Sequence, residues 1–448
     1  MIQAVKNAFR LPDVRNKLLI TGLLLVIYRF AAYVPVVGVD PNALQALLDP
    51  SNAGAGFINV LNLLSGGAVR NFSVIANGVY PYITAQIIFQ LLIPIVPRLE
   101  AMQREPGGQQ KLERYTYYLA IPMAILQSLG QISIFNTLLQ TSGGGSTSII
   151  PGFSTNPLLA LSVITTMTAG TMFAIWLGEL ITEQGIGNGI SIIIFAGIVA
   201  QMPNNLFNLI NSNQDRALYN IALFVIITLV SVVAIIYIQE GVRRIPVQYG
   251  KRVRGRKMYG GQSTHIPLRV NPVGMIPLIF AQSIITFPAI IASLFPPGPL
   301  GDSIRITFGQ QQGFGYWGTF FLFTVGFTFF YSDVMVGNQN LAENLQRNGG
   351  FIPGIRPGKR TEDYIVSVTR RITVVGALFL GIIAVVPGIL AWFNGLIFPF
   401  ESVSVSSASN AAAVITGSGL IIVVGVVVDT MRQLEAQLMM RNYEGFMR

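Results

Sequence analysis

Long runs of apolar residues alternate with shorter polar segments along almost the whole chain. A helix needs about 20 apolar residues to cross the hydrocarbon core of a bilayer. Runs of this kind predict spanning helices at roughly residues 18–37, 74–96, 115–139, 157–178, 190–210, 218–238, 272–296, 315–336, 372–392 and 411–429. The pattern therefore predicts an all-α polytopic membrane protein with ten transmembrane helices.

Residues 57–73 depart from this pattern. They read FINVLNLLSGGAVRNFS, which is mildly apolar, too short to span, and interrupted by Ser65-Gly66-Gly67. Backbone at membrane depth must be buried in protein or line a wet cavity. The segment is therefore either re-entrant, which implies a cavity in the bundle, or an amphipathic stretch on the outer surface. The residues alone leave both readings open.

Composition and charge agree with a membrane protein. Only 11% of the 448 residues are charged, against about a quarter in soluble domains. With the ten spans above, 25 of the 29 lysines and arginines fall on one side of the membrane, three on the other, and Arg29 lies within the first span. This asymmetry predicts that both termini are cytoplasmic. Because residues 1–17 are polar, we expect no cleavable signal peptide and a multi-pass protein of the bacterial cytoplasmic membrane.

The residue types that carry chemistry are scarce. The chain has no cysteine and one histidine, His265, which argues against a catalytic triad or a zinc site of usual composition. The string PGIRPGKRTE lacks the glycine spacing of a nucleotide-binding loop. No predicted span carries a mid-membrane carboxylate, which counts against a proton or sodium symporter. We therefore expect no catalytic residues, no metal and no cofactor, although a structural scaffold stays open.

Two long loops on the cytoplasmic side are rich in positive charge. Residues 239–271 carry eight lysines and arginines, and residues 337–371 carry six. Alternation over residues 244–249 and a second run near 256–259 predict a small β-hairpin, whereas Gly and Pro in the second loop predict turns rather than a helix. The charge has two readings: membrane topology with contact to anionic lipid, or docking of an anionic partner such as RNA.

Four segments resemble the SecY family, the channel subunits of protein translocases. They are GTMFAIWLGELITEQGIGNGISIIIFAGIVA at 170–200, LSGGAVRNFSVIANGVYPYITAQIIFQLL at 64–92, QSTHIPLRVNPVGMIPLIFAQSII at 262–285 and ENLQRNGGFIPGIRPG at 343–358. The matches keep the same order from about residue 15 to residue 445. The resemblance implies two pseudo-symmetric five-helix halves, 1–210 and 218–448, joined by a hinge at 211–217, with a short re-entrant plug helix near 57–72.

The resemblance also implies roles for particular residues. The pore waist would be a ring of aliphatic side chains: Val79, Ile83, Ile190, Ile194, Ile279 and Ile422. The plug would include Phe57, Leu61, Leu64, Ser65, Gly66 and Gly67. Polar residues on or near the lateral gate would be Thr84, Gln86, Gln127, Asn271 and Gln282, although ordinary interhelical bonding explains them equally well. The docking surface would include Arg256, Lys257, Arg356, Lys359 and Arg360.

The function implied by the resemblance is a passive, gated protein-conducting channel. Unfolded preproteins would cross it, and signal peptides and membrane helices would leave sideways into the lipid bilayer. SecE and SecG would complete a heterotrimer, and SecA or the translating ribosome would supply the energy. Without the resemblance, the leading alternative is a secondary transporter of small solutes, which the missing intramembrane carboxylates and the oversized basic loops disfavour.

Overall fold

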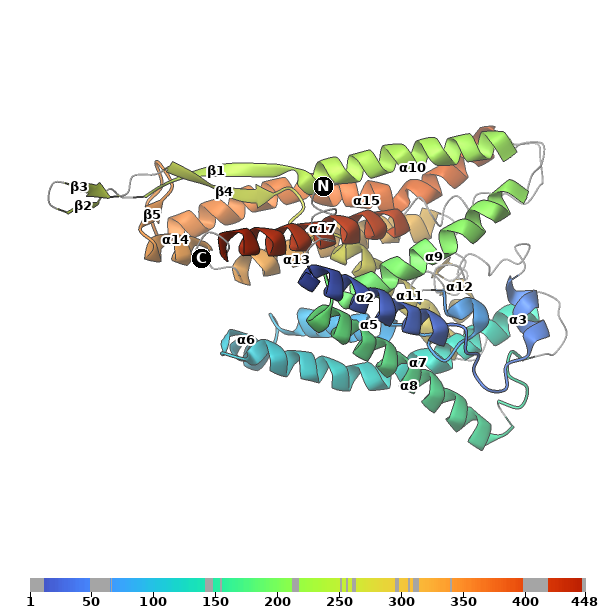
Figure 1. Ribbon diagram of the computed structural model, residues 1–448. Helices are drawn as coiled ribbons and strands as arrows, with labels where there is room; N and C mark the ends of the chain where they lie inside the picture. The colour runs from blue at the N-terminus through green and yellow to red at the C-terminus, as the bar shows by residue number, and fades with distance from the viewer. Residues whose placement is uncertain are drawn as a thin grey trace.

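The structure is a computed structural model of the chain. It describes residues 12–48, 65, 67–141, 148–153, 155–211, 217–249, 252–254, 257–259, 263–294, 298–304, 307–308, 314–338, 341–397 and 418–444. The architecture is mostly helical, with a small amount of β-structure projecting from one end of the helices (Figure 1).

A helix occupies each of the predicted apolar runs. These helices are α2 (Pro12–Ala31), α5 (Tyr80–Leu92), α7 (Gly108–Thr141), α8 (Pro157–Gln184), α9 (Gly189–Asn211), α10 (Ala217–Glu240), α11 (Ile276–Leu294), α13 (Phe314–Asn338), α15 (Lys359–Ile397) and α17 (Ser418–Glu444). Within the described residues, α7, α8, α13 and α15 are each long and apolar enough to cross a membrane. Helices α9, α10 and α11 contribute shorter apolar stretches of 10–17 residues.

The second apolar run is broken into two helices. Helix α5 ends at Leu92, and α6 (Pro97–Arg104) leaves it at an angle of 106°. Pro94 lies in the break and Pro97 opens α6. Proline cannot continue a helix from its interior but suits the first turn. The predicted span of 74–96 is therefore too long at both ends, because residues 74–79 form turns before α5.

The remaining short elements lie outside the long helices. They are α3 (Pro41–Leu48), the 3₁₀ turn η1 (Val69–Asn71), α12 (Pro299–Ile304) and α14 (Leu341–Arg347). Helix α14 corrects the expectation that residues 337–371 contain turns but no helix. A second correction is that α15 begins at Lys359, inside the same loop.

The strands form a platform at one end of the molecule. Strand β1 (Val242–Tyr249) lies between β4 (Ser263–Arg269) and β5 (Gly350–Phe351), antiparallel to both. Beyond them, β2 (Arg252–Arg254) pairs with β3 (Lys257–Tyr259), and this tip projects farthest from the helices (Figure 1). The predicted projecting hairpin is present, but its pairing differs from the expectation: residues 244–249 pair with β4 and β5, whereas 257–259 pair with β2.

The platform has its own hydrophobic core. Ile245, Val247 and Leu268 of the sheet pack against Leu345 of α14 and against the first turns of α15, where Ile365 is 2% exposed. A helix that begins in this core and continues into the bundle joins the two parts without a linker. The sheet platform, defined here as β1, β4, β5 and α14, is thus fixed relative to the long helices.

Within the bundle, α11 lies between two groups of helices. It packs against α5 and α7 on one side and against α13 on the other. Figure 1 shows α2, α5, α7 and α8 together, and α10, α13, α15 and α17 on the opposite side. Helix α17 packs against α9 and α10, which closes the bundle around a large buried core.

The glycine-rich turn between α8 and α9 is tightly packed. A Cβ atom at Gly189 would lie 1.8 Å from the carbonyl oxygen of Gly178 in α8. The Gly189 N–H also donates to the hydroxyl of Thr182 at 2.9 Å. No side chain fits here unless α8 and α9 move apart. The glycine at this position therefore permits a close approach of the two helices.

Replacing Gly189 by alanine should destabilise the protein. Overpacking of this kind costs about 1–3 kcal/mol, so Gly189→Ala should lower the melting temperature of the detergent-solubilised protein. The matched control is Gly326→Ala in α13, where a Cβ meets nothing within 4 Å. Alanine favours helix by about 1 kcal/mol over glycine, so the control should melt at the same or a higher temperature. Equal melting of both variants would contradict the close approach.

Candidate functional site

The six residues expected to form a waist converge in the middle of the bundle. Val79 immediately precedes α5 and Ile83 lies in it, Ile190 and Ile194 lie in α9, Ile279 in α11 and Ile422 in α17. Five of them belong to one hydrophobic cluster, and the half-buried Ile190 packs against it. Val79 and Ile194 are 0% exposed. Residues more than 300 positions apart in the sequence are thus brought into one hydrophobic core.

The chemistry of this core is what a hydrophobic constriction would require. Its members at these positions are branched aliphatics, which repel water and offer no directional bonds. A narrow aliphatic opening of this kind excludes ions by dewetting, yet it does not grip a passing chain. Residues of α2, α8, α10, α13 and α15 also belong to this cluster. The six expected waist residues are therefore packed against neighbouring helices.

A direct hydrogen bond joins α5 to α11. The Tyr80 hydroxyl donates to the carbonyl oxygen of Ser283. Tyr80 was not among the sequence-predicted gate residues. The available signal was a tyrosine at the start of an apolar helix, because a buried tyrosine hydroxyl usually requires a partner. The bond crosses the seam between α5 and α11, where the resemblance places a lateral gate.

The sequence-predicted gate residues make other contacts. Gln127 of α7 donates to the Thr84 hydroxyl of α5 at 3.3 Å, so these two meet across α5 and α7. Gln282 of α11 donates to the Tyr316 hydroxyl of α13 at 3.3 Å. Asn271 exchanges hydrogen bonds with the backbone of Gly274 and stabilises the turn that leads into α11. Gln86 is half-buried on α5.

Removing the Tyr80 hydroxyl should loosen the seam. Hydrogen bonds between membrane helices contribute about 0.6 kcal/mol on average and up to about 1.7. Tyr80→Phe should therefore shift any equilibrium between closed and separated α5 and α11 by roughly threefold to twentyfold. The chain has no native cysteine, so spin labels on cysteines placed at Leu92, at the end of α5, and at Ile276, at the start of the antiparallel α11, report the distance between the two helices without background.

The control for this measurement is Tyr237→Phe. Tyr237 is 79% exposed on α10, away from the seam. Its variant should leave the distance distribution unchanged. A Tyr80→Phe distribution that matches the parent would show that this bond does not hold α5 to α11.

The described part of the expected plug contacts α2. The carbonyl oxygen of Ser65 accepts a hydrogen bond of 2.7 Å from the Tyr28 hydroxyl. Gly67 has φ +93°, and a Cβ there would lie 2.7 Å from a guanidinium nitrogen of Arg29. Arg29, the charge within the first span, thus lies beside this segment. The other expected plug residues, Phe57, Leu61, Leu64 and Gly66, lie outside the described residues.

The chain after Gly67 is held in place by several contacts. The backbone N–H of Val69 donates to the Ser65 hydroxyl at 3.2 Å. Phe72 adopts φ 42° and is fully buried, with its ring 5.6 Å from that of Phe135 in α7. Its carbonyl accepts from the N–H of Val36 at 3.0 Å. Residues 67–69, 72 and 73 are therefore buried, whereas Arg70 is exposed, so this part of the segment is anchored in the bundle.

The basic residues expected to dock partners lie at the platform end. Arg356 is exposed in the turn between Gly354 and Gly358, which have φ +82° and +105°. Its carbonyl accepts from the Thr361 hydroxyl at 2.9 Å, which fixes the turn to the first turn of α15. Lys359 and Arg360 are exposed in that same helical turn. Lys257 lies on β3, and Arg256 lies outside the described residues.

No metal-binding group is apparent in the part of the chain that the structure describes, since no three His, Asp or Glu side chains gather there. The arrangement instead combines a buried hydrophobic cluster that contains the expected waist residues, a hydrogen bond between α5 and α11, and an exposed basic turn. These features suit a pore and a docking surface.

Solved structures share this architecture. The fold matches a protein-conducting channel with a TM-score of 0.62 and 17% identity, covering 96% of both chains. It matches a structure in which the plug domain of SecY stabilises the closed channel with a TM-score of 0.61, 19% identity and 96% coverage of both. It also matches Sec61 of the canine ribosome–channel complex with a TM-score of 0.53, 16% identity and 96% coverage of both.

Sequence relatives match along their full length. A protein translocase subunit SecY of Halalkalibacterium halodurans is 41% identical, and one of Bacillus subtilis is 40% identical, each covering 100% of both chains. One of Streptomyces scabiei is 39% identical with the same coverage. The SecY family profile matches residues 73–431. The chain belongs to the SecY family of protein translocase channel subunits.

Proposed function

We propose that the chain is the central pore-forming subunit of a Sec translocase. It acts as a passive, gated channel through which unfolded preproteins cross the cytoplasmic membrane and membrane helices leave sideways. The observation that carries the proposal is the buried aliphatic core at the centre of the bundle, to which α5, α9, α11 and α17 all contribute waist residues. The alternative of a small-solute transporter has no structural observation in its favour.

The proposed architecture has ten spans in two halves. The ten long helices fall on the ten apolar runs of the sequence, and Figure 1 shows them in two groups with α11 between. In this architecture the N-terminal half is residues 1–210 and contains the first five spans. The C-terminal half is residues 218–448 and contains the last five, and residues 211–217 are the hinge. The distribution of 25 of the 29 lysines and arginines to the platform side supports cytoplasmic termini.

The proposal assigns three parts of the channel: a pore ring, a plug and a lateral gate. The ring of Val79, Ile83, Ile190, Ile194, Ile279 and Ile422 closes the pore to ions. The segment from about residue 57 to 72 is the plug, with Ser65 and Gly67 docked beside α2. Helices α5 and α11 are the lateral gate, closed by the bond from Tyr80 to Ser283.

The proposed partners supply the energy for transport and complete the complex. It carries no recognisable nucleotide-binding motif, so energy comes from SecA or the translating ribosome, which bind the basic turn at Arg356 and the hairpin tip. A guanidinium suits both phosphate and carboxylate acceptors. SecE and SecG complete the heterotrimer. One structural relative is Sec61 in a ribosome–channel complex, which supports the ribosome as a partner.

Reconstitution tests this function. The chain is placed with a SecE-type partner in proteoliposomes, and SecA, ATP and a signal-bearing preprotein are added outside. We expect the preprotein to become resistant to protease only when ATP is present. Correct insertion and SecA binding without any protection would overturn the proposal and leave solute transport as the activity to test.

A further inference from the structure

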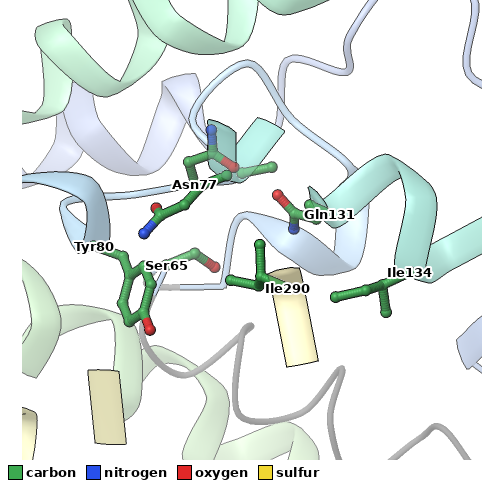
Figure 2. Close-up of a pocket in the computed structure, with 8 residues that line it drawn as sticks. Ser65, Asn77, Tyr80, Gln131, Ile134 and Ile290 are labelled. Atoms are coloured by element: carbon green, nitrogen blue, oxygen red, sulfur yellow. The ribbon is translucent and has the colours of Figure 1, made fainter. Parts of the chain in front are cut away.

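A small polar cavity lies where α5, α7 and α11 meet. It has a volume of about 20 Å³. Its polar lining comes from Ser65, Asn77, Tyr80, Gln127 and Gln131. Figure 2 shows Asn77 and Tyr80 on one side of it, Gln131 and Ile134 on another, and Ile290 between them. The cavity thus touches the plug segment through Ser65 and both helices of the seam.

Two side chains that line this cavity each have one amide atom without a hydrogen-bond partner among the described residues. Among the described residues, the Gln127 Oε1 atom accepts no hydrogen bond and the Gln131 Nε2 atom donates none. Both residues are almost fully buried, at 3% and 5% exposure. Buried polar groups in folded proteins are nearly always hydrogen-bonded, so two unpartnered amide atoms in one cavity require an explanation.

Water meets all the requirements of this site. A buried water needs roughly 10–15 Å³ of space and about two to four polar partners. The cavity is large enough, and both glutamines that line it have an unpartnered amide atom, an acceptor on Gln127 and a donor on Gln131. A water molecule can donate to the first and accept from the second. An apolar guest would leave both amides unsatisfied, and the volume is too small for an organic ligand.

We propose that this cavity is a binding site for an ordered water molecule that bridges Gln127 and Gln131. The other Gln127 amide atom already donates to Thr84 of α5, so the water extends a polar chain from α5 through α7 toward α11. Ile290 of α11 closes the cavity by packing on Gly130 of α7, where a Cβ would lie 2.3 Å from the Ile290 side chain.

The water lies where α11 meets α5 and α7, so it would affect how the gate opens. This role rests on the proposed function. If α11 separates from α5 and α7 as the gate opens, Ile290 leaves the wall of the cavity. The amides of Gln127 and Gln131 are then already hydrated, so the seam opens without first exposing dry polar groups to lipid. The interface therefore contains a solvated point beside the hydrogen bond from Tyr80 to Ser283.

A high-resolution map of the full chain with its partner subunits in a lipid nanodisc tests the site without any transport assay. We expect a density peak within hydrogen-bond distance of both amides, and its loss in the double variant Gln127→Met and Gln131→Met. A map that resolves other buried waters but shows no peak here would overturn the proposal. Because this readout needs no substrate, its failure is distinguishable from failure of the channel function.

Thermal melting provides a second, independent test. Gln131→Met removes one partner of the water, so the melting temperature should fall by more than about 2 °C relative to the control Gln86→Met on the half-buried face of α5. If the cavity is dry, the same variant removes an unsatisfied buried amide and should raise the melting temperature instead. A melting temperature equal to or above that of the control overturns the proposal.

Discussion

Arg356→Glu should abolish most SecA-driven transport while leaving the channel folded. The side chain is exposed in a turn that is fixed through its backbone by Thr361, so the substitution does not disturb the platform core. A guanidinium recognises phosphate or carboxylate through charge-assisted, often bidentate bonds. Reversing its charge replaces attraction by repulsion, and ATP-dependent protection of a preprotein should fall by at least about tenfold.

The matched control is Arg347→Glu on α14. Arg347 belongs to the same platform and forms an ion pair with Glu343 at 2.6 Å. Both side chains of that pair are more than half exposed, at 74% and 56%, and such pairs contribute little. The control should therefore transport almost normally. Equal loss in both variants would indicate a general effect of platform charge, and no loss in Arg356→Glu would remove this turn from the docking surface.

The second large effect is expected at the waist. Truncating Ile194 of α9 and Ile422 of α17 to alanine widens the aliphatic constriction from both sides. A wider opening stays wet and conducts ions, so the resting ion conductance of the channel in planar bilayers should rise by at least about tenfold. The ring assignment predicts this leak in the absence of any translocating chain.

Matched controls separate a leak from a loss of packing. Val199 on α9 and Val427 on α17 are 38% and 44% exposed, and alanine there should not raise conductance. Truncation of a buried isoleucine also costs about 2–5 kcal/mol, so the melting temperature of each variant must be recorded. A destabilised Ile194→Ala and Ile422→Ala protein that remains ion-tight would place these residues in ordinary packing rather than at a pore.

The sequence predicted the position of the long helices well, because lipid as a solvent imposes a simple length rule on apolar runs. It failed where a helix continues beyond the apolar run. Helix α15 begins at Lys359 although the apolar run begins near residue 372, since its first turns are buried by the sheet platform and not by lipid. The pairing of β1 with β4 also escaped prediction, because it depends on contacts outside the segment that shows alternation.

The candidate site was harder to predict from the sequence than the fold. Nearly every residue of a spanning helix is apolar, so nothing in the pattern distinguishes Ile194 from Ile193. The ring residues came from the resemblance, and the structure brings them into one cluster. The bond from Tyr80 to Ser283 joins positions 203 residues apart. Such a contact depends on how α5 and α11 face each other, which local periodicity does not encode.

Helix α15 connects the exposed turn to the interior mechanically. It contains 39 residues and extends for about 58 Å at the usual rise per residue. It starts three residues after Arg356, and its first internal proline is Pro387. Proline is the usual place for a helix to bend, so the segment before it acts as a stiff rod. A force applied at the turn would therefore be transmitted to the bundle by a stiff helix and not absorbed by a flexible tether.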